Sequence, residues 1–544
     1  MTETHELRIA VIGAGPAGVY SSDIFLRQLK KLGEELGLGT AARIDLFEKL
    51  PVPFGLVRYG VAPDHPSIKF IASALEKTLD NPDIHLYCDV EFGKDVTLDE
   101  LLERYDAVLF ATGAVEDKPL GLPGADLDGV YGAAKFVEWY DGYPTGAREW
   151  PLEAEEVAVI GGGNVAMDVA RELMRNADDL KARTDIPDNV YEGIKENKAR
   201  VLHLFIRRGV AQAKFSVQEL REMEKLPGVQ LIINEDDFDL DEDTIEEAGK
   251  DKLTRQMVEE LFTIREMAED MEDDGDVDYE GNTADRKYYV HFNSAPVEVL
   301  GEDGKVVGIR VEKTETSADG KMSRTGKFEE YPVQAVYHAI GYKPATAPGI
   351  AYDERHAHLA NANGDGRITT TASAEDGAQV RERLYATGWA KRGPVGLIGS
   401  TKSDALLIVT NMLEDLSKAA EGGRVAADRD PESIDRLLAS RGVKPIDFAG
   451  WKKVDAYERA DGAKEGRELR PGADARPGSR LRWVFETQSD RFQASFMRLG
   501  CPLLENRTPG EKLSVRTSAT APSPFHSPVS SAYPAKTQDR KSVV

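Results

Sequence analysis

The feature that most restricts how this chain can fold is a glycine-rich turn that follows a short apolar segment. Residues 7–12 are apolar enough for a buried strand, residues 13–18 read Gly-Ala-Gly-Pro-Ala-Gly, and a helical pattern continues to about Leu36. A second apolar strand, residues 44–47, ends at Glu48. A strand, a glycine turn, a helix and a strand with a terminal carboxylate together form a dinucleotide-binding unit. We therefore expect a dinucleotide site at this turn.

Each residue type in this unit has a physical reason. Gly13 permits the tight turn, Gly15 lets the backbone approach a pyrophosphate, and Gly18 lets the helix pack closely on the strand. The helix N-terminus presents unpaired N–H groups and a partial positive charge to phosphates. The carboxylate of Glu48 can accept hydrogen bonds from ribose hydroxyls.

A second copy of the pattern begins near residue 157. Residues 157–160 form the expected strand, residues 161–166 form the turn, and residues 165–174 are expected to be helical. Ala166 replaces the third glycine and is still small enough for close packing. The chain therefore holds two nucleotide sites.

The strand that follows the second turn ends in basic residues. Residues 201–206 form the next expected strand, and Arg207 and Arg208 stand where an NAD-binding protein has an acid. Two guanidinium groups suit the 2′-phosphate of NADP, which they can bind through charge-assisted hydrogen bonds. The alternative is an ordinary solvated basic pair.

Two nucleotide sites in one chain suggest a flavin and a nicotinamide. Strands that run into small-residue turns at 106–113 and 336–344 mark expected crossings between two domains. A third strand-to-glycine element, at 384–389, is expected to return the chain to the flavin. We predict an α/β fold with two Rossmann-like three-layer nucleotide-binding domains, the NADP domain inserted into a discontinuous FAD domain. The expected segments are 1–114 (FAD), 115–345 (NADP), 346–456 (FAD) and a C-terminal tail, 457–544, that is disordered or loosely attached.

Composition excludes several classes of protein. The formal net charge of −26 argues against general nucleic-acid binding and against adhesion to anionic membranes. The two cysteines, Cys88 and Cys501, are too few for an iron–sulfur cluster and form no CxxC pair, which argues against a disulfide reductase. The chain has no apolar run long enough to span a membrane, and its first residues lack a signal peptide, so we expect a cytoplasmic protein.

Longer motifs resemble a known family. They are residues 53–66, residues 163–171, the pair Arg207-Arg208 with residues 219–223, and residues 388–396, which read Gly-Trp-Ala-Lys-Arg-Gly-Pro-Val-Gly. On these motifs the chain resembles the adrenodoxin-reductase-like ferredoxin–NADP⁺ reductases, within the glutathione-reductase-like flavoproteins. The resemblance covers about residues 5–455 and stops before the tail.

The resemblance implies cofactor contacts and reactive groups. The implied FAD contacts are Gly13, Gly15, Pro16, Ala17, Gly18, Glu48, Leu56, Val90, Trp389, Gly396, Leu397 and Ile398. The implied NADP(H) contacts are Gly163, Asn164, Val165, Ala166, Arg207, Arg208, Glu219 and Gly396. His65 and Glu222 match residues near the nicotinamide and flavin, and with Asp64 they are the expected catalytic groups. No metal ligand is implied.

The implied activity is hydride transfer from NADPH to flavin N5, followed by one-electron transfers to a ferredoxin-type iron–sulfur protein. Asp64, His65 and Glu222 would position the nicotinamide amide or relay a proton, and the alternative for His65 is a structural hydrogen bond at a turn. We expect the acidic partner to dock on a basic patch formed by the neighbours of Arg207-Arg208 and by Lys250, Lys252, Arg255 and Arg265. The oligomeric state is left open.

Two other functions remain as alternatives. One is an NADPH-dependent flavin monooxygenase, and the other is a non-catalytic flavoprotein that senses NADP(H). The tail, rich in Pro, Ser and Arg, is either a regulatory arm or a segment of foreign origin such as an altered reading frame, and we assign it no chemistry.

Overall fold

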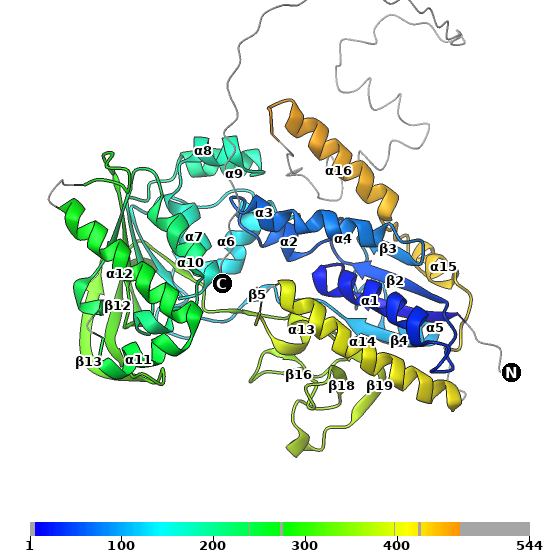
Figure 1. Ribbon diagram of the computed structural model, residues 1–544. Coiled ribbons are helices and arrows are strands. Elements are labelled where there is room, and N and C mark those ends of the chain that lie inside the picture. The colour runs from blue at the N-terminus through cyan, green and yellow to red at the C-terminus, as the bar shows by residue number, and fades with distance from the viewer. Residues whose placement is uncertain (1–5, 239, 273–275, 397, 423–425, 468–544) are drawn as a thin grey trace, which may run out of the picture. The chain divides into compact units, whose positions relative to one another are not determined.

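Two six-stranded sheets organise the part of the chain that the computed structural model describes, which is residues 6–238, 240–272, 276–396, 398–422 and 426–467. The first sheet has the order β18-β19-β4-β1-β2-β3 (Figure 1). Its strands are β1 (Leu7–Ile12), β2 (Ala42–Glu48), β3 (Ile84–Cys88), β4 (Ala107–Phe110), β18 (Arg367–Thr369) and β19 (Val380–Ala386). All are parallel to their neighbours except β18, which is antiparallel to β19.

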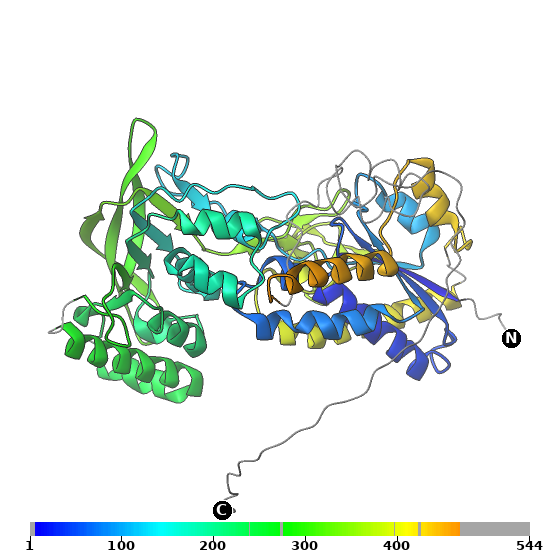
Figure 2. The same cartoon turned by 90° about the horizontal axis from the view of Figure 1, so that it is seen from above.

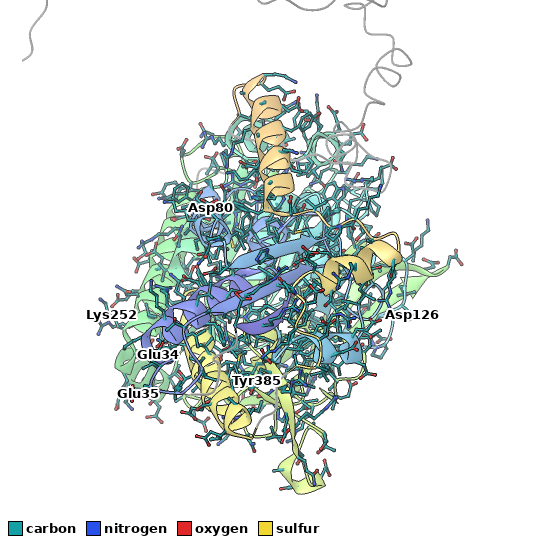
Figure 3. All side chains as sticks on the ribbon, turned by 90° about the vertical axis from the view of Figure 1, so that its right-hand side faces the viewer. Glu34, Glu35, Asp80, Asp126, Lys252 and Tyr385 are labelled. Carbon is teal, nitrogen blue, oxygen red and sulfur yellow. The ribbon has the colours of Figure 1, made fainter. Side chains whose placement is uncertain are left out.

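Both faces of the first sheet are buried. Alternate residues of β1 divide between two apolar clusters, with Ile9 on one face and Ala10 on the other. The helices α1 (Pro16–Leu32) and α14 (Ile398–Glu421) cover the first face, and α5 (Leu98–Arg104) and α15 (Ser433–Ser440) cover the second. A strand buried on both faces is therefore mostly apolar, as at residues 7–12. The exception is Arg8, which is buried and donates a hydrogen bond to the Asp430 carbonyl oxygen (2.8 Å). Tyr385, on β19, lies within this sheet (Figure 3).

The second sheet has the order β6-β14-β7-β8-β10-β9 and is parallel throughout. Its strands are β6 (Val130–Gly132), β7 (Glu156–Ile160), β8 (Val201–Phe205), β9 (Val229–Ile233), β10 (Arg286–His291) and β14 (Ala335–His338). One face packs on α6 (Ala133–Tyr140), α7 (Asn164–Met174), α10 (Val217–Glu224) and α12 (Lys252–Glu272). The other face packs on a three-stranded antiparallel sheet of β11 (Ser294–Glu302), β12 (Lys305–Thr316) and β13 (Met322–Tyr331).

The chain enters the second sheet and returns from it at one place. The first sheet takes its strands from residues 7–110 and 367–386, whereas all strands of the second lie between residues 130 and 338. The two connecting segments pair as β5 (Glu116–Asp117) and β15 (Tyr342–Lys343). In Figures 1 and 2 the blue N-terminal segment and the yellow segment accordingly lie together, and the green segment forms its own group. The predicted fold class is confirmed, while the boundaries at residues 114 and 345 stay predictions.

Shorter elements complete the described chain. They are α2 (Leu56–Tyr59), α3 (Pro66–Lys69), α4 (Ile71–Leu79), α8 (Ala177–Arg183), α9 (Asp188–Lys195), α11 (Glu242–Lys250), α13 (Trp389–Arg392), β16 (Tyr352–Asp353) and β17 (His358–Leu359). The expected helix to about Leu36 is too long, because α1 ends at Leu32. A Cβ at Gly33 would lie 1.8 Å from the Gly39 carbonyl oxygen, so the chain folds back at this glycine.

The C-terminal helix corrects the predicted start of the tail. The helix α16 (Phe448–Ala463) crosses the expected boundary between residues 456 and 457. Glu458 on this helix is 1% exposed and forms an ion pair with Arg58 at 2.6 Å. The buried Arg467 guanidinium donates hydrogen bonds to the carbonyl oxygens of Thr184 (3.1 Å) and Ile186 (2.5 Å). Residues 457–467 are therefore part of the folded unit, and the rest of the predicted tail, with Cys501, lies outside the described residues.

Candidate active site

The residues expected to bind FAD follow the carboxyl ends of the parallel strands in the first sheet. Gly13 follows β1, Glu48 ends β2, Val90 follows β3 and Trp389 follows β19. Because these four strands run in one direction, their carboxyl ends meet at a single edge. This is the edge at which open α/β sheets bind their ligands.

Two glycines of the first turn are required by backbone contacts. Gly13 has φ +108°, and a Cβ there would lie 2.5 Å from the Ala111 carbonyl oxygen. A Cβ at Gly18 would lie 2.0 Å from the Gly13 carbonyl oxygen. The tight turn and the close helix packing that the sequence predicts are both present.

The Glu48 carboxylate is joined to the first turn. Its Oε2 accepts a hydrogen bond from Ala14 N (2.9 Å), and its Oε1 accepts one from Leu50 N (3.0 Å). Burial raises the pKa of this carboxyl, and the hydrogen bonds from the two amides oppose the effect. Each oxygen keeps a lone pair for a second donor such as a ribose hydroxyl, so the residue fits the predicted role.

The other expected FAD contacts differ in exposure. Val90 is buried, and Leu56 and Trp389 are partly exposed. Because Gly388 has no side chain, the segment before α13 can approach the first turn closely. A Cβ at this position would lie 2.8 Å from Ala17 Cβ. Pro16 begins α1, Gly396 precedes α14 and Ile398 begins it, whereas Leu397 lies outside the described residues.

The second turn follows β7 and has the same design. A Cβ at Gly161 would lie 2.6 Å from the Ala339 carbonyl oxygen, so this glycine is also required by close backbone packing. The helix α7 begins at Asn164 with Gly163 as its N-cap, and no side chain caps it. Its first N–H groups are therefore left for another acceptor, such as a phosphate. Val165 lies in the first turn of this helix, and Ala166 is fully buried.

Arg207 and Arg208 follow β8, next to the second turn. Their backbone is held by hydrogen bonds from Thr314 Oγ1 to Arg207 O (2.9 Å) and from Asn293 N to Arg208 O (3.0 Å). Within the described residues neither guanidinium has an ion-pair partner, and the Arg208 Nε is buried without a hydrogen-bond acceptor. A buried N–H without a partner is costly, so the position suits a phosphate oxygen.

The three expected catalytic residues come together from two segments of the chain. His65 is the N-cap of α3 and is 6% exposed, and its Nε2 lies 2.6 Å from Glu222 Oε2 on α10. The His65 Nε2 also lies 3.9 Å from Asp64 Oδ1. The imidazole thus contacts α10, one of the helices that cover the second sheet, and the catalytic role of His65 stays a prediction.

A buried arginine on α7 organises this cluster. The Arg171 guanidinium is 0% exposed and donates to Asp64 (2.6 Å), Asp168 (2.6 Å) and Glu219 (2.8 Å). Its Nη2 lies 3.0 Å from His65 Nε2. Glu219, expected to contact NADP(H), is therefore bonded to Arg171 beside the histidine.

Burial and neighbouring charges shift the pKa values of the carboxyl groups in this cluster. Burial acts to raise the pKa of Asp64, but the Arg171 guanidinium outweighs it and lowers that pKa to about 2. Burial and the neighbouring Asp168 raise the pKa of Glu219 to about 7, against the opposing effect of Arg171. Burial also raises the pKa values of Asp168 and Glu172. The cluster therefore retains a proton near neutral pH, within reach of His65.

Arg171 and Asp168 were not selected from the sequence as site residues. A signal was present, because Asp168 and Arg171 lie three residues apart on a helix that is mostly apolar, and oppositely charged residues at this spacing can pair. Their partners Asp64 and Glu219 are 107 and 48 residues distant from Arg171, and no local pattern connects them.

The chain is similar to known nicotinamide-dependent flavoproteins. Residues 7–245 match the family model described as pyridine nucleotide-disulphide oxidoreductase. Over 468 residues the chain is 36% identical to the NADPH-ferredoxin reductase FprA of Mycobacterium tuberculosis, covering 84% of this chain and 95% of the relative. It is 34% identical to the mitochondrial NADPH:adrenodoxin oxidoreductase of Bos taurus, covering 86% and 90%. The solved structure of M. tuberculosis FprA in complex with NADPH superimposes with a TM-score of 0.77 at 33% identity, covering 88% of this chain and all of that one.

Proposed function

The chain belongs to the family of NADPH-dependent ferredoxin and adrenodoxin reductases, and we propose that it passes electrons from NADPH through FAD to a ferredoxin-type iron–sulfur protein. The observation that carries this proposal is the contact between His65, beside the first sheet, and Glu222, beside the second, at 2.6 Å. One glycine turn accompanies each sheet, so two nucleotides bound at the two sheet edges would bring their reactive rings toward this contact.

The residues divide into two binding sets. The first turn and Glu48 hold FAD, which supplies hydride acceptance from NADPH and one-electron donation to the partner when bound. The second turn and the guanidinium groups of Arg207 and Arg208 hold NADPH through its phosphates. This role of the arginines is supported by their lack of an acidic partner among the described residues.

His65 and Glu222 form the proton-holding pair. Their 2.6 Å contact joins His65 Nε2 to Glu222 Oε2, and Glu222 is partly exposed, so the pair can exchange its proton with water. The Arg171 guanidinium orients both by holding Asp64 and Glu219 on either side. Arg171 is accordingly a positioning residue.

Disulfide chemistry is not supported, although the family model carries that name. Cys88 is fully buried and lies at the end of β3, and it is the one cysteine in the described part of the chain. Burial and the nearby carboxylate of Glu48 raise its pKa well above the usual thiol value. The described chain therefore supplies no pair of cysteines of the kind that such reductases need.

The docking surface for the iron–sulfur protein stays a prediction. Three of the four basic residues proposed for it have acidic partners: Lys250 with Glu247, Arg255 with Glu259 and Arg265 with Glu235. Lys252, at the start of α12, is exposed and has no ion-pair partner among the described residues (Figure 3). We therefore centre the proposed patch on Lys252.

Location and segment boundaries are proposed on the sequence. No helix in the described residues has both the length and the apolar character required to cross a bilayer. The curated relatives include mitochondrial proteins, so the cytoplasmic location remains a prediction.

We keep the proposed FAD segments at 1–114 and from 346, and the NADP segment at 115–345. We extend the second FAD segment to residue 467 because α16 is folded against Arg58.

The test is anaerobic reduction of the FAD-loaded protein by NADPH and by NADH. Loss of flavin absorbance should be much faster with NADPH at equal concentration. The variants Arg207→Ala and Arg208→Ala should each weaken NADPH binding by roughly 10–100-fold, because a hydrogen bond to a charged group contributes about 1.5–3 kcal/mol. Their rates with NADH should stay unchanged. Equal reduction by both nucleotides would contradict the NADP(H) assignment, and a protein that cannot be loaded with FAD would contradict the enzyme.

A further inference from the structure

A short hairpin before the return to the first sheet brings three metal-ligating side chains together. Asp353 ends β16, His358 begins β17, and His356 lies in the turn between them. One ligand atom from each side chain lies within 4.8 Å of the other two. Ala357, between the histidines, has φ +55°, an uncommon conformation for a residue with a Cβ. Such backbone conformations persist only where the surrounding structure enforces them.

The carboxylate of this group is buried, and the basic side chain in ion-pair contact with it in the described chain is His356. The Asp353 side chain is 9% exposed, and its Oδ1 and Oδ2 accept hydrogen bonds from His356 N (2.9 Å) and His356 Nδ1 (2.8 Å). No lysine or arginine of the described chain forms an ion pair with it. The two hydrogen bonds from His356 stabilise the carboxylate in its charged form, and a metal cation bound beside it would compensate that charge.

The second histidine is oriented as metal ligands usually are. His358 Nδ1 lies 2.9 Å from the Leu359 carbonyl oxygen and 3.5 Å from Asn361 Nδ2. A carbonyl oxygen can only accept, so we assign the proton to Nδ1 from the shorter contact. The lone pair then belongs to Nε2. A backbone carbonyl that accepts from one ring nitrogen is the common device that fixes the tautomer of a metal-binding histidine.

Two other groups of histidine and carboxylate side chains lie in the active site, and they differ from the hairpin group because an arginine lies among them. The groups Asp64–His65–Glu222 and His65–Asp168–Glu219 both surround the Arg171 guanidinium. That cation already pairs with Asp64, Asp168 and Glu219, and it would repel a second cation. The hairpin group has no such cation at ion-pair distance within the described chain.

We propose that Asp353, His356 and His358 bind a divalent first-row transition-metal ion such as Zn²⁺, with solvent completing its coordination. Two imidazoles and one carboxylate are a common zinc donor set, and they exclude a preference for Mg²⁺, which selects oxygen ligands. The site is separate from the reductase chemistry.

The hairpin is linked to the FAD side of the chain by hydrogen bonds. Asn361 Nδ2 donates to the Lys391 carbonyl oxygen (3.0 Å) on α13, and Lys391 Nζ lies 2.6 Å from Asp404 Oδ1. Asp404 Oδ2 in turn accepts from Gly388 N (2.6 Å), the residue before Trp389. A bound ion would therefore stabilise the segment that positions α13.

The test measures binding of Zn²⁺ to the FAD-loaded full chain, without a histidine tag, by equilibrium dialysis with metal analysis and by calorimetry. We expect one Zn²⁺ per chain and no comparable binding of Mg²⁺. Asp353→Asn and His358→Gln should each weaken Zn²⁺ binding by roughly tenfold or more. Loss of a residue that only supports a metal ligand already weakens binding by about tenfold, and these two residues are ligands in the proposal. His85→Gln, which alters a histidine on β3, should leave it unchanged.

Flavin content and the flavin spectrum report whether each variant is folded. A wild-type chain that fails to bind Zn²⁺ would overturn the proposal without any variant. Binding that is kept in both folded variants would also overturn it. Binding that is lost in His65→Gln and kept in His358→Gln would assign the ion to the active-site cluster instead, against the argument from Arg171.

Discussion

The ion pair between Arg58 on α2 and Glu458 on α16 should be among the costliest contacts to break. The Arg58 Nη2 lies 2.6 and 2.8 Å from the two carboxylate oxygens, and the side chains are 14% and 1% exposed. The Arg58 guanidinium also lies over the Trp451 ring, at 5.4 Å from its centroid. In Glu458→Gln the arginine keeps its charge and its burial but loses the carboxylate.

The magnitude follows from this burial. Removing one partner of a buried pair costs about 3–5 kcal/mol, whereas an exposed pair contributes about 0–1 kcal/mol. We therefore expect Glu458→Gln to lower the free energy of unfolding by about 3 kcal/mol or more. The same helix offers a matched control in the ion pair between Lys452 and Glu76, whose side chains are 47% and 24% exposed. Glu76→Gln should cost about 1 kcal/mol or less.

The assay is urea unfolding followed by circular dichroism and flavin fluorescence, with the first transition compared between variants. The double variant Arg58→Met/Glu458→Met should be more stable than Glu458→Gln, because it removes the unpaired charge along with the carboxylate. A loss in Glu458→Gln no larger than that in Glu76→Gln would mean that water reaches Arg58, and it would refute the reasoning. The placement of residues 457–467 in the folded unit would then depend on the hydrogen bonds of Arg467 alone.

Three further predictions concern the site. Gly13→Ala places a Cβ 2.5 Å from the Ala111 carbonyl oxygen and should abolish FAD retention, whereas Gly249→Ala on α11, which meets no atom within 4 Å, should retain FAD. A pKa of Glu219 raised to about 7 means that the folded chain holds this proton more tightly than the unfolded chain, so stability should fall between about pH 4.5 and 7. Glu219→Gln should flatten that part of the stability curve, and an unchanged curve would count against the assignment. Lys252→Glu should slow reduction of an acidic ferredoxin several-fold at low salt and less at high salt, and a salt-independent rate would place docking elsewhere.

Local sequence was sufficient to locate both nucleotide-binding units. The glycines at Gly13 and Gly161 are demanded by backbone contacts at the end of a single strand, and the adjoining strand and helix lie next to them in sequence. Such local contacts restrict which residue type can stand at each position, so the sequence alone predicts them. The insertion of one unit into the other was also predictable, because strand-to-turn patterns recur at the two crossings, where β5 and β15 pair.

The active-site cluster could be predicted only in part. His65, Glu222 and Asp64 were selected through the family resemblance, whereas the Arg171 that holds their neighbours was not. A charged residue on a helix is usually solvated, and its burial depends on which distant carboxylates pack against it.

Tertiary packing also decided the role of the C-terminal helix. Residues near Glu458 have weak apolar periodicity and read as the start of a tail, yet the partner of Glu458 is Arg58, 400 residues away. The glycine turns depend on steric contacts within a few bonds of the backbone, and their positions could be predicted from residue order. The ion pairs of Arg58 and Arg171 form between charges that only the folded chain brings together and removes from water. The sequence pattern therefore does not show which charged residues will pair.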